Sequence, residues 1–442
     1  MTQFASENYR TVQPDANVEN VDFCNVTAWL PDKENWNERY LGAGGGGFTA
    51  GRWFMSDHIR TGAIGEGYLT SSTDGGLGPV GLNTGMDSTY ILRSPGNVDQ
   101  YTLRNFASVS LNEQAIISKP LAKTFYGKPP LYSYWNGCSG GGRQGLKLAQ
   151  QYPRRTTASP LQHQLLTTFN PSVLVGTLTH CSQIDSKVKI SSAAATVIKA
   201  LWKGVVTPQG EQITNPYTPG CDFTGVTRRF LGIANTDCSR NDSWASQPNV
   251  PGQQWVSPLD AKDPMVDISR CQSSPNGLPD QFLRLWIGKD SNIDLSKLTV
   301  EKFVEMVLEG AREYAPLFAT NDPDLSKFRD AGGKMITVHG VADSHIPIRN
   351  SVDYYENVRS LLPDVGKFYR YFEIPGWSLC FGGTGGQPTA IFDQLRAWVE
   401  NGTAPESSPV SFVDSKGVEW NRILCPFPQK SQYSKEWRCD RC

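Results

Sequence analysis

The stretch Leu131-Tyr-Ser-Tyr-Trp-Asn-Gly-Cys-Ser139-Gly-Gly-Gly-Arg-Gln-Gly145 decides the fold. Its aromatic, alternating start at 131–135 predicts a strand, and the composition of Leu146–Tyr152 predicts a helix. The glycines between them suit a turn in which Ser139 takes a strained backbone conformation that crowds any neighbouring side chain. Such a turn exposes the serine hydroxyl and points the N–H of Gly140 toward the place where an oxyanion would form. The pattern therefore predicts a nucleophilic serine.

A strand, a glycine turn and a helix around Gly-x-Ser-x-Gly form the nucleophile elbow of α/β hydrolases, the alternative being a glycine-rich loop with a surface serine. The first 130 residues are predicted as strands and glycine loops. Further strands are predicted at 334–339 and 367–374, and helices at 191–202, 303–314 and 391–399. We expect an α/β fold of the α/β-hydrolase type, with a mostly parallel sheet, an inserted lid and disulfides. The expected parts are the N-terminal part of the hydrolase domain with the elbow (1–153), a shortened lid-type insertion (154–300) and the C-terminal part of the hydrolase domain (301–442).

The composition excludes several classes of partner. The 442 residues carry 42 Lys and Arg against 43 Asp and Glu, a net charge of −1, which argues against a strongly basic nucleic-acid-binding protein. The sequence contains no run of about 18 apolar residues, which a membrane-spanning helix would need. The segment 42–47 matches the dinucleotide pattern G-x-G-x-x-G, but no clear helix or acidic residue follows where that motif needs them. We therefore expect no nucleic-acid, membrane or nucleotide partner.

The cysteines indicate an oxidising compartment. There are ten, they are scattered, and Asn-x-Ser/Thr acceptors for glycosylation occur at Asn25, Asn241 and Asn401. Only Cys439-Asp-Arg-Cys442 has the spacing of a metal pair, and it has no second pair. Disulfides, a glycoprotein, a secreted location and no metal are the expectations. Residues 1–7 lack the basic and apolar regions of a signal peptide, so an intracellular location is the alternative.

At this point the residues resemble the fungal tannase and feruloyl esterase family of α/β hydrolases. The resemblance covers most of 20–155 and 195–440 and is carried by Phe23-Cys-Asn-Val-Thr27, Leu41–Gly47, Gly137–Gly145, Asn321-Asp-Pro-Asp-Leu-Ser326, His339-Gly-Val-Ala-Asp343, Pro375-Gly-Trp-Ser-Leu-Cys380, Trp398-Val-Glu-Asn-Gly402 and Cys425-Pro-Phe-Pro428. It implies a serine carboxylic-ester hydrolase of phenolic-acid esters, such as galloyl and feruloyl esters. Its partner would be a small aromatic ester or a plant polymer.

The family's site consists of a Cys-Ser pair, an Asp and a His-Cys pair. By resemblance, Ser139 is the nucleophile, Asp343 is the orienting acid, and Cys138 and Cys380 form a disulfide that joins the serine and histidine loops. The family's histidine position is Leu379 here, and leucine cannot accept a proton. The candidate oxyanion donors are Gly140, Gly45 and Gly46.

The missing base has a large expected cost, because loss of a triad base lowers kcat about a million-fold in comparable enzymes. His345, two residues from Asp343, is the candidate substitute, although this spacing suggests that it points away from the serine. His339 is interpreted as a packed loop residue. Two alternatives to an active esterase stay open. One is an impaired or inactive homologue that binds an aromatic ester or a glycan without cleaving it, and the other is a repurposed enzyme of secondary metabolism.

Three further departures from the family pattern bear on the site. Leu77 stands where the family often has a second histidine. The family's calcium loop corresponds to 181–189, where only Asp185 remains of three aspartates, so no calcium or other cofactor is expected. The strand that usually follows the elbow helix is absent after Tyr152-Pro153, so we expect a lost central strand and an exposed sheet edge.

Overall fold

The computed structural model describes the positions of residues 26–51, 54–77, 88–154, 158–162, 192–219, 221, 234–240, 266–275, 277–380, 382–414, 416–433 and 436–440. Within these ranges, no helix is both long enough and apolar enough to cross a membrane.

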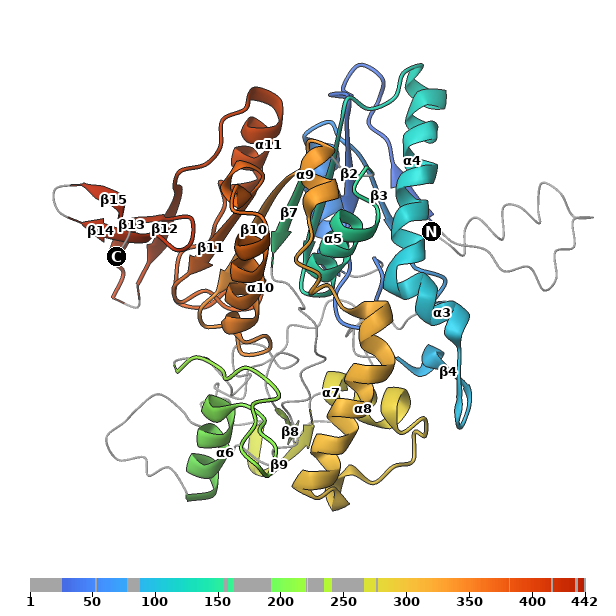
Figure 1. Ribbon diagram of the computed structural model, residues 1–442, viewed down its shortest axis with the longest axis vertical. Helices are drawn as coiled ribbons and strands as arrows, with labels where there is room; N and C mark the ends of the chain where they lie inside the picture. Colours follow the sequence, from blue (N-terminus) through green and yellow to red (C-terminus); the bar gives the residue numbers. More distant parts are fainter. Residues whose placement is uncertain are drawn as a thin grey trace, which may run out of the picture.

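A seven-stranded sheet forms the centre of the molecule, in the order β1-β3-β2-β6-β7-β10-β11 (Figure 1). The first edge strand, β1, runs antiparallel to β3, and the other neighbouring pairs are parallel. This confirms the α/β-hydrolase expectation of a mostly parallel sheet. The strands are β1 (Val26–Trp29), β2 (Arg39–Ala43), β3 (Leu69–Thr73), β6 (Tyr132–Cys138), β7 (Ala158–Gln162), β10 (Lys334–Gly340) and β11 (Tyr369–Ile374).

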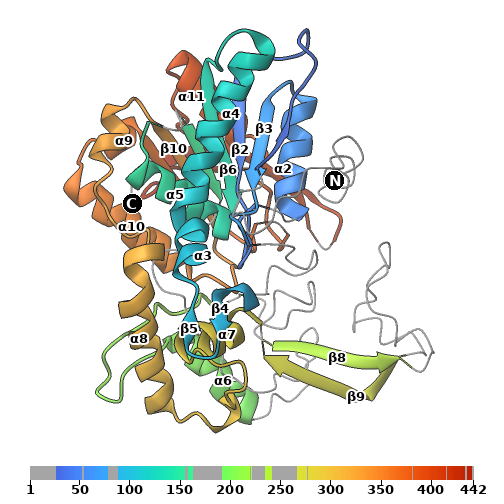
Figure 2. The same ribbon diagram turned by 90° about the vertical axis from the view of Figure 1, so that its right-hand side faces the viewer.

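Helices cover both faces of the sheet because successive strand residues point to opposite sides. On β6, Trp135 packs into the core beneath one set of helices, and Tyr134 packs into the core on the other face. The first set comprises α4 (Ser110–Tyr126), α5 (Gly140–Gln151), α9 (Ser326–Asp330) and α10 (Ile348–Leu361). The second comprises α2 (Phe54–Gly65) and α11 (Ile391–Asn401), as Figure 2 shows from the side.

The expected loss of a central strand is wrong. Strand β7 lies between β6 and β10 and pairs in parallel with both. Its sequence, Ala-Ser-Pro-Leu-Gln, contains a proline and little of the continuous apolar character expected of a buried parallel strand, which is why the pattern missed it. The strand position adjacent to the nucleophile strand is therefore filled.

The description of the first 130 residues as strands and loops is also wrong, most clearly for α4. Its buried face carries small and polar residues, including Gln114 and Ser118, which hydrogen bond to Ser71 of β3. Its exposed face carries Ile117 and Phe125, which are 45% and 43% exposed. This inverted distribution hides the helix from a search for apolar periodicity.

A second layer lies below the sheet in Figure 1 and is built around an aromatic core. The core includes Phe318, whose ring contacts the rings of Phe106 and Trp286. This layer therefore draws on segments before and after the expected lid as well as on the lid itself. Its elements are β4 (Leu92–Ser94), β5 (Asn97–Val98), α3 (Gln100–Arg104), α6 (Ser192–Lys203), β8 (Ala234–Arg240), β9 (Val266–Pro275), α7 (Gly277–Gln281) and α8 (Val300–Phe318).

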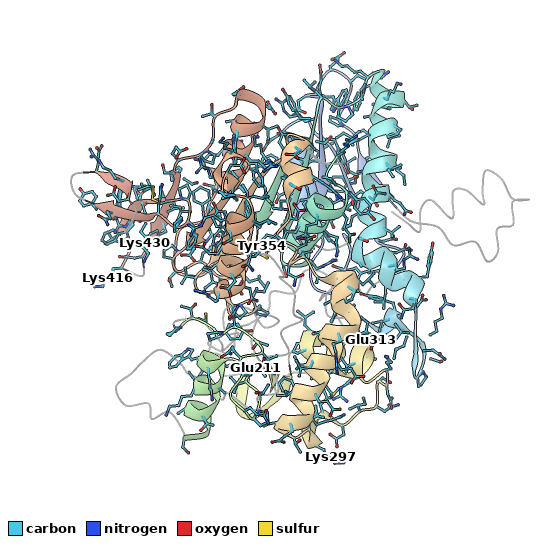
Figure 3. All side chains as sticks on the ribbon, viewed as in Figure 1. Glu211, Lys297, Glu313, Tyr354, Lys416 and Lys430 are labelled. Carbon is cyan, nitrogen blue, oxygen red and sulfur yellow. A yellow bond between two sulfur atoms is a disulfide. The ribbon has the colours of Figure 1, made fainter. Side chains whose placement is uncertain are left out.

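Two antiparallel hairpins near the C-terminus project from the sheet beside β11. They are β12 (Ser408–Val413) with β13 (Glu419–Leu424), and β14 (Lys430–Tyr433) with β15 (Trp437–Asp440). The Cys425–Cys439 disulfide ties them together. Figure 3 places Lys416 and Lys430 at this projection and Tyr354 in the body of the fold.

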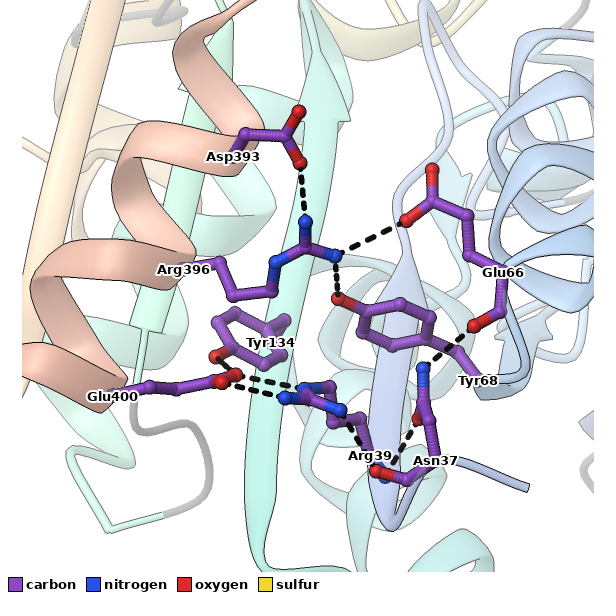
Figure 4. Close-up of polar contacts among 8 residues, drawn as sticks. All are labelled: Asn37, Arg39, Glu66, Tyr68, Tyr134, Asp393, Arg396 and Glu400. Carbon is purple, nitrogen blue, oxygen red and sulfur yellow. Dashed lines mark hydrogen bonds and ion pairs between the residues drawn. The ribbon is translucent and has the colours of Figure 1, made fainter. Parts of the chain in front are cut away.

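An ion-pair cluster at the sheet end away from the elbow holds α11 against the strands (Figure 4). Arg39 of β2 donates Nε to Glu400 Oε1 at 2.7 Å and Nη2 to Oε2 at 2.5 Å, and the Tyr134 hydroxyl donates to Oε1 at 2.5 Å. Burial by itself raises the pKa of Glu400, but the hydrogen bonds from Arg39 and Tyr134 outweigh it and hold the pKa below its ordinary value. The carboxylate therefore stabilises the fold in its charged form.

Replacing Glu400 by Gln should lower the free energy of unfolding by about 2 kcal/mol near neutral pH, since hydrogen bonds to charged groups contribute about 1.5–3 kcal/mol. The folded-state pKa of Glu400 lies below the unfolded value of about 4.3. The contribution is therefore complete above that value and is lost as the pH falls through the folded pKa. Urea unfolding at a series of pH values should show the wild-type advantage shrink in acid.

The matched control is Glu406→Gln, because Glu406 is 74% exposed in its pair with Arg370 and should contribute less than about 1 kcal/mol. An advantage from Glu400 that stayed constant down to about pH 3 would contradict the assigned role of its charge.

Candidate active site

Ser139 stands at the turn between β6 and α5, with backbone angles φ 55° and ψ −120°. A positive φ is costly for a residue with a side chain, and this turn avoids further clashes by placing glycines around it. A Cβ on Gly137 would lie 2.6 Å from the backbone of Gly141. The serine is 8% exposed, and no hydrogen bond joins its hydroxyl to another described residue.

A glycine loop after β2 packs directly against the elbow. A Cβ on Gly140 would lie 3.2 Å from Gly46 Cα and 3.3 Å from Gly47 N. This close approach of two backbones brings Gly140, the residue after Ser139, beside the peptide that joins Gly46 to Gly47. Two amide donors near a nucleophile are the arrangement that stabilises an oxyanion.

The candidate donors differ in their hydrogen bonds. The N–H of Gly45 donates to Gln144 Oε1 at 2.9 Å, so in this structure it is engaged elsewhere and does not suit the oxyanion role expected from the sequence. The N–H of Gly46 makes a long contact of 3.4 Å with Thr49 Oγ1. Gly46, with its neighbour Gly47, is thus the better placed part of the loop.

Asp343 lies in the turn after β10 and is fully buried. Its Oδ1 accepts hydrogen bonds from the backbone N–H groups of His345 and Ile346, at 2.8 and 3.0 Å. Its Oδ2 lies 3.3 Å from His339 Nε2. Hydrogen bonds from two backbone groups fix the orientation of the carboxylate, which is what an acid that orients a base requires.

His339 is packed, as expected, but it belongs to strand β10 and contacts the acid. Its Nδ1 lies 2.6 Å from Ser351 Oγ, and its Nε2 lies 3.0 Å from the carbonyl oxygen of Ile346. Nδ1 is therefore engaged by helix α10, and Nε2 by the Asp343 turn. The His339-Gly-Val-Ala-Asp343 motif contains both partners of this contact, but its spacing alone did not predict that the two side chains meet.

Leu379 lies in the loop after β11, next to the disulfide that joins Cys138 to Cys380 with a Cα–Cα distance of 5.7 Å. The Ala342 N–H donates to the carbonyl oxygen of Trp377, which ties this loop to the Asp343 turn. The structure thus brings together the serine, the acid and the Leu379 loop, which are far apart in the chain.

The Leu379 side chain is 6% exposed and packs in an apolar cluster with Ile346, the two disulfide cysteines and Met55. The position that resembles the family's base is therefore occupied by hydrocarbon. His345, the candidate substitute, directs Nδ1 toward Ser344 Oγ at 3.3 Å. No hydrogen bond joins its ring, or that of His339, to Ser139 in the described part of the chain.

Two basic side chains of α5, Arg143 and Lys147, fasten the nucleophile helix to its surroundings. The buried Arg143 guanidinium donates to the carbonyl oxygens of Phe106 and Ala107, at 3.3 and 3.0 Å, and burial lowers its pKa to about 10. Lys147 donates to the carbonyl oxygen of Ala319 at 2.7 Å, and burial lowers its pKa to about 8. These bonds anchor the elbow helix to segments of the second layer.

The remaining sequence expectations concern Leu77 and the calcium loop. Leu77 is 7% exposed and packs into the aromatic core of the second layer. The loop at 181–189, in which Asp185 is the single aspartate, lies outside the described residues, so the expected absence of calcium stays a prediction. No step of the chemistry is assigned to a metal.

Comparisons with known proteins show which family the chain belongs to. The model of the family described as tannase and feruloyl esterase matches residues 12–158 and 244–441. The chain is 29% identical to a probable feruloyl esterase of Arthroderma benhamiae, over 92% of this chain and 80% of that protein. It is 24% identical to a tannase of Aspergillus oryzae, over 92% of this chain and 83% of that protein.

Solved structures show the same fold. Tannin acyl hydrolase from Aspergillus niger superposes with a TM-score of 0.74 at 21% identity, covering 96% of this chain and 85% of that one. Feruloyl esterase B from Aspergillus oryzae superposes with a TM-score of 0.68 at 19% identity, covering 96% and 88%. The elbow, the sheet and the family match lead to one classification. This chain belongs to the tannase and feruloyl esterase family of carboxylic ester hydrolases.

Proposed function

We propose that this chain acts on esters of phenolic acids through Ser139, and that the lack of a side-chain base limits its turnover. The left-handed backbone of Ser139 carries the proposal, because this conformation is that of a nucleophile elbow, and the next residue, Gly140, packs against the Gly46–Gly47 peptide. The names of the relatives, feruloyl esterase and tannase, support the substrate class.

In the proposed reaction the Ser139 oxygen adds to the ester carbonyl carbon, and the negative oxygen is held by N–H groups of Gly140 and of Gly46 or Gly47. Collapse expels the alcohol and leaves the acyl group on the serine. Water then attacks the acyl-enzyme and releases the acid. The proton of the attacking hydroxyl passes to solvent in both steps, because Leu379 offers no acceptor. Solvent also supplies the proton that the leaving alcohol oxygen takes in the first step and Ser139 takes in the second.

This reasoning predicts that the acyl-enzyme accumulates. An activated ester such as 4-nitrophenyl ferulate has a good leaving group and can acylate a poorly activated serine, whereas attack by water on the resulting ester still needs a base. Intact-mass measurement at about pH 9 should find one feruloyl group on the wild-type protein and none on Ser139→Ala. A peptide digest should place the group on Ser139.

A second candidate function is binding of a phenolic ester without cleavage. The close packing of Leu379 beside the disulfide favours it, since an apolar wall can hold an aromatic acyl group but cannot take up a proton. Saturable binding of methyl ferulate together with no covalent label from the activated ester would support this second function. Failure to bind or react with either ester would contradict both proposals.

The proposed location is outside the cell. Two disulfides in the described residues, Cys138–Cys380 and Cys425–Cys439, are typical of proteins that fold in an oxidising compartment. Asn401 of an Asn-Gly-Thr acceptor sequence is exposed at the end of α11. A mass shift of the secreted protein on glycosidase treatment, mapped to Asn401, would test this location.

A further inference from the structure

The side chain of Gln144 bridges the two ends of the glycine loop that faces the nucleophile. Its Oε1 accepts from the N–H of Gly45 at 2.9 Å, and its Nε2 donates to the carbonyl oxygen of Ala50 at 2.8 Å. The side chain is fully buried, on the helix that begins immediately after Ser139. One amide thus connects the nucleophile helix to both ends of the segment 45–50.

The segment enclosed by this bridge is the part that approaches the serine. Within it, the N–H and hydroxyl of Thr49 both donate to the carbonyl oxygen of Gly46, at 3.0 and 2.6 Å, which closes a tight turn. The peptide between Gly46 and Gly47 lies against Gly140. Any movement of the bridge would therefore move this peptide relative to the N–H of Gly140.

We propose that Gln144 is a positioning residue for the proposed ester hydrolysis. Its amide holds the Gly46–Gly47 peptide at the separation from Gly140 that lets both sides of the oxyanion site act on one oxygen. The inference rests on the proposed function. Gln144 acts through the loop, so its loss should weaken binding of the transition state more than binding of the ester in its ground state.

Gln144→Met keeps the approximate size of the side chain and removes both hydrogen bonds. The rate of Ser139 acylation by 4-nitrophenyl ferulate should fall about 10- to 100-fold, since complete loss of one oxyanion donor costs about 100- to 1,000-fold. The half-saturating ester concentration should change less than about threefold, because an interaction made only in the transition state affects kcat and not binding of the ester. When Gln144→Met is combined with Leu379→His, kcat should likewise fall while KM changes little.

Gln150→Met is the matched control on the same helix. The Gln150 amide donates to the carbonyl oxygens of Thr320 and Asp322 and to the Tyr354 hydroxyl, at 2.9, 3.0 and 3.1 Å, and makes no contact with the glycine loop. Its loss should lower the melting temperature and leave the acylation rate unchanged. Equal losses of rate in both variants would indicate a general packing defect and overturn the proposal.

Gln144→Glu offers a rescue that depends on pH. A protonated carboxyl can accept from Gly45 through its carbonyl oxygen and donate to Ala50 through its hydroxyl, as the amide does. An ionised carboxylate has no hydrogen to donate. Burial raises the pKa of such a carboxyl group. The ratio of the Ser139 acylation rate in Gln144→Glu to that in the parent protein should therefore be near one in acid and fall as the pH rises. A ratio independent of pH would contradict the bridging role.

Hydrogen exchange separates failure of this inference from failure of the proposed function. Peptides covering residues 44–50 should exchange faster in Gln144→Met than in the parent and in Gln150→Met, whether or not any ester reacts. Exchange that is unaltered in Gln144→Met would overturn the positioning role. Suppose instead that exchange is faster in Gln144→Met but Ser139 is acylated neither in the wild type nor in Leu379→His. That result would overturn the hydrolase function, and with it the role of Gln144 in the reaction.

Discussion

Leu379→His is expected to raise kcat/KM for methyl ferulate at least about 1,000-fold. The loss of a triad base costs about a million-fold in comparable enzymes, and an introduced histidine should recover part of that. Three features favour recovery. Asp343 is already oriented by two backbone hydrogen bonds, the Cys138–Cys380 disulfide joins the two loops, and β7 completes the sheet beside the elbow.

The introduced imidazole also makes a pH signature. A histidine accepts a proton only when neutral, so the rate should rise through about pH 6.5, the ordinary imidazole pKa, and then level off. The wild-type protein has no imidazole at position 379, so its rate of hydrolysis should continue to rise with hydroxide concentration. Steady-state hydrolysis of methyl ferulate from about pH 5 to 9 measures both profiles.

Two controls decide whether the gain comes from the triad. Leu379→Gln introduces a polar side chain at the same place without a base and should give no gain. Ser139→Ala in the Leu379→His background should return the rate to that of the single Ser139→Ala variant, because the members of a triad act as a unit. If Leu379→His is folded and no faster than Leu379→Gln, the loop does not bring residue 379 within reach of Ser139.

Removing the Cys138–Cys380 disulfide should cause the largest loss of stability. The bond closes a loop with a sequence separation of 242 residues, for which chain entropy gives about 5 kcal/mol. The Cys425–Cys439 bond, with a separation of 14, corresponds to about 3 kcal/mol. The double variant Cys138→Ala/Cys380→Ala should therefore have a free energy of unfolding about 2 kcal/mol lower than Cys425→Ala/Cys439→Ala. Urea unfolding of the two variants measures this difference.

The same pair of double variants tests the tether as part of the site. Placed in the Leu379→His background, loss of Cys138–Cys380 should abolish most of the gain in kcat/KM, since residue 379 is held beside the serine through this bond. Loss of Cys425–Cys439 should leave the gain intact, because that bond lies in the C-terminal hairpins. Equal stability and equal rates in the two double variants would contradict the assigned role of the long-range bond.

The nucleophile elbow could be predicted from sequence because its cause is local. Ser139 needs a left-handed backbone, only glycines fit around it, and the strand and helix that form the turn are adjacent in the chain. The consequence of Leu379 could also be predicted from sequence, because a leucine side chain cannot accept a proton in any structural environment. The resemblance supplied the partners, and the structure places their loops together.

The elements that were missed depend on distant neighbours. Helix α4 turns Gln114 and Ser118 inward because Ser71 of β3 offers them hydrogen bonds, so its pattern is the reverse of an ordinary amphipathic helix. Strand β7 exists because β6 and β10 leave an unpaired gap between them, and their backbone groups stabilise a sequence with weak strand propensity. The sequences of α4 and β7 contain no sign of these distant partners, so neither element could be predicted from its own residues.

The sequence alone determined which groups are present: a serine on a glycine turn, an aspartate, and a leucine where the resemblance leads one to expect a base. Only the tertiary structure decided which groups serve that chemistry, including the engagement of Gly45 by Gln144 and of Asp343 by His339. The reason is physical. Backbone conformation at a turn depends on adjacent residues, whereas the hydrogen bonds of a buried amide or imidazole depend on which distant groups the packing of the sheet and helices brings within about 3 Å.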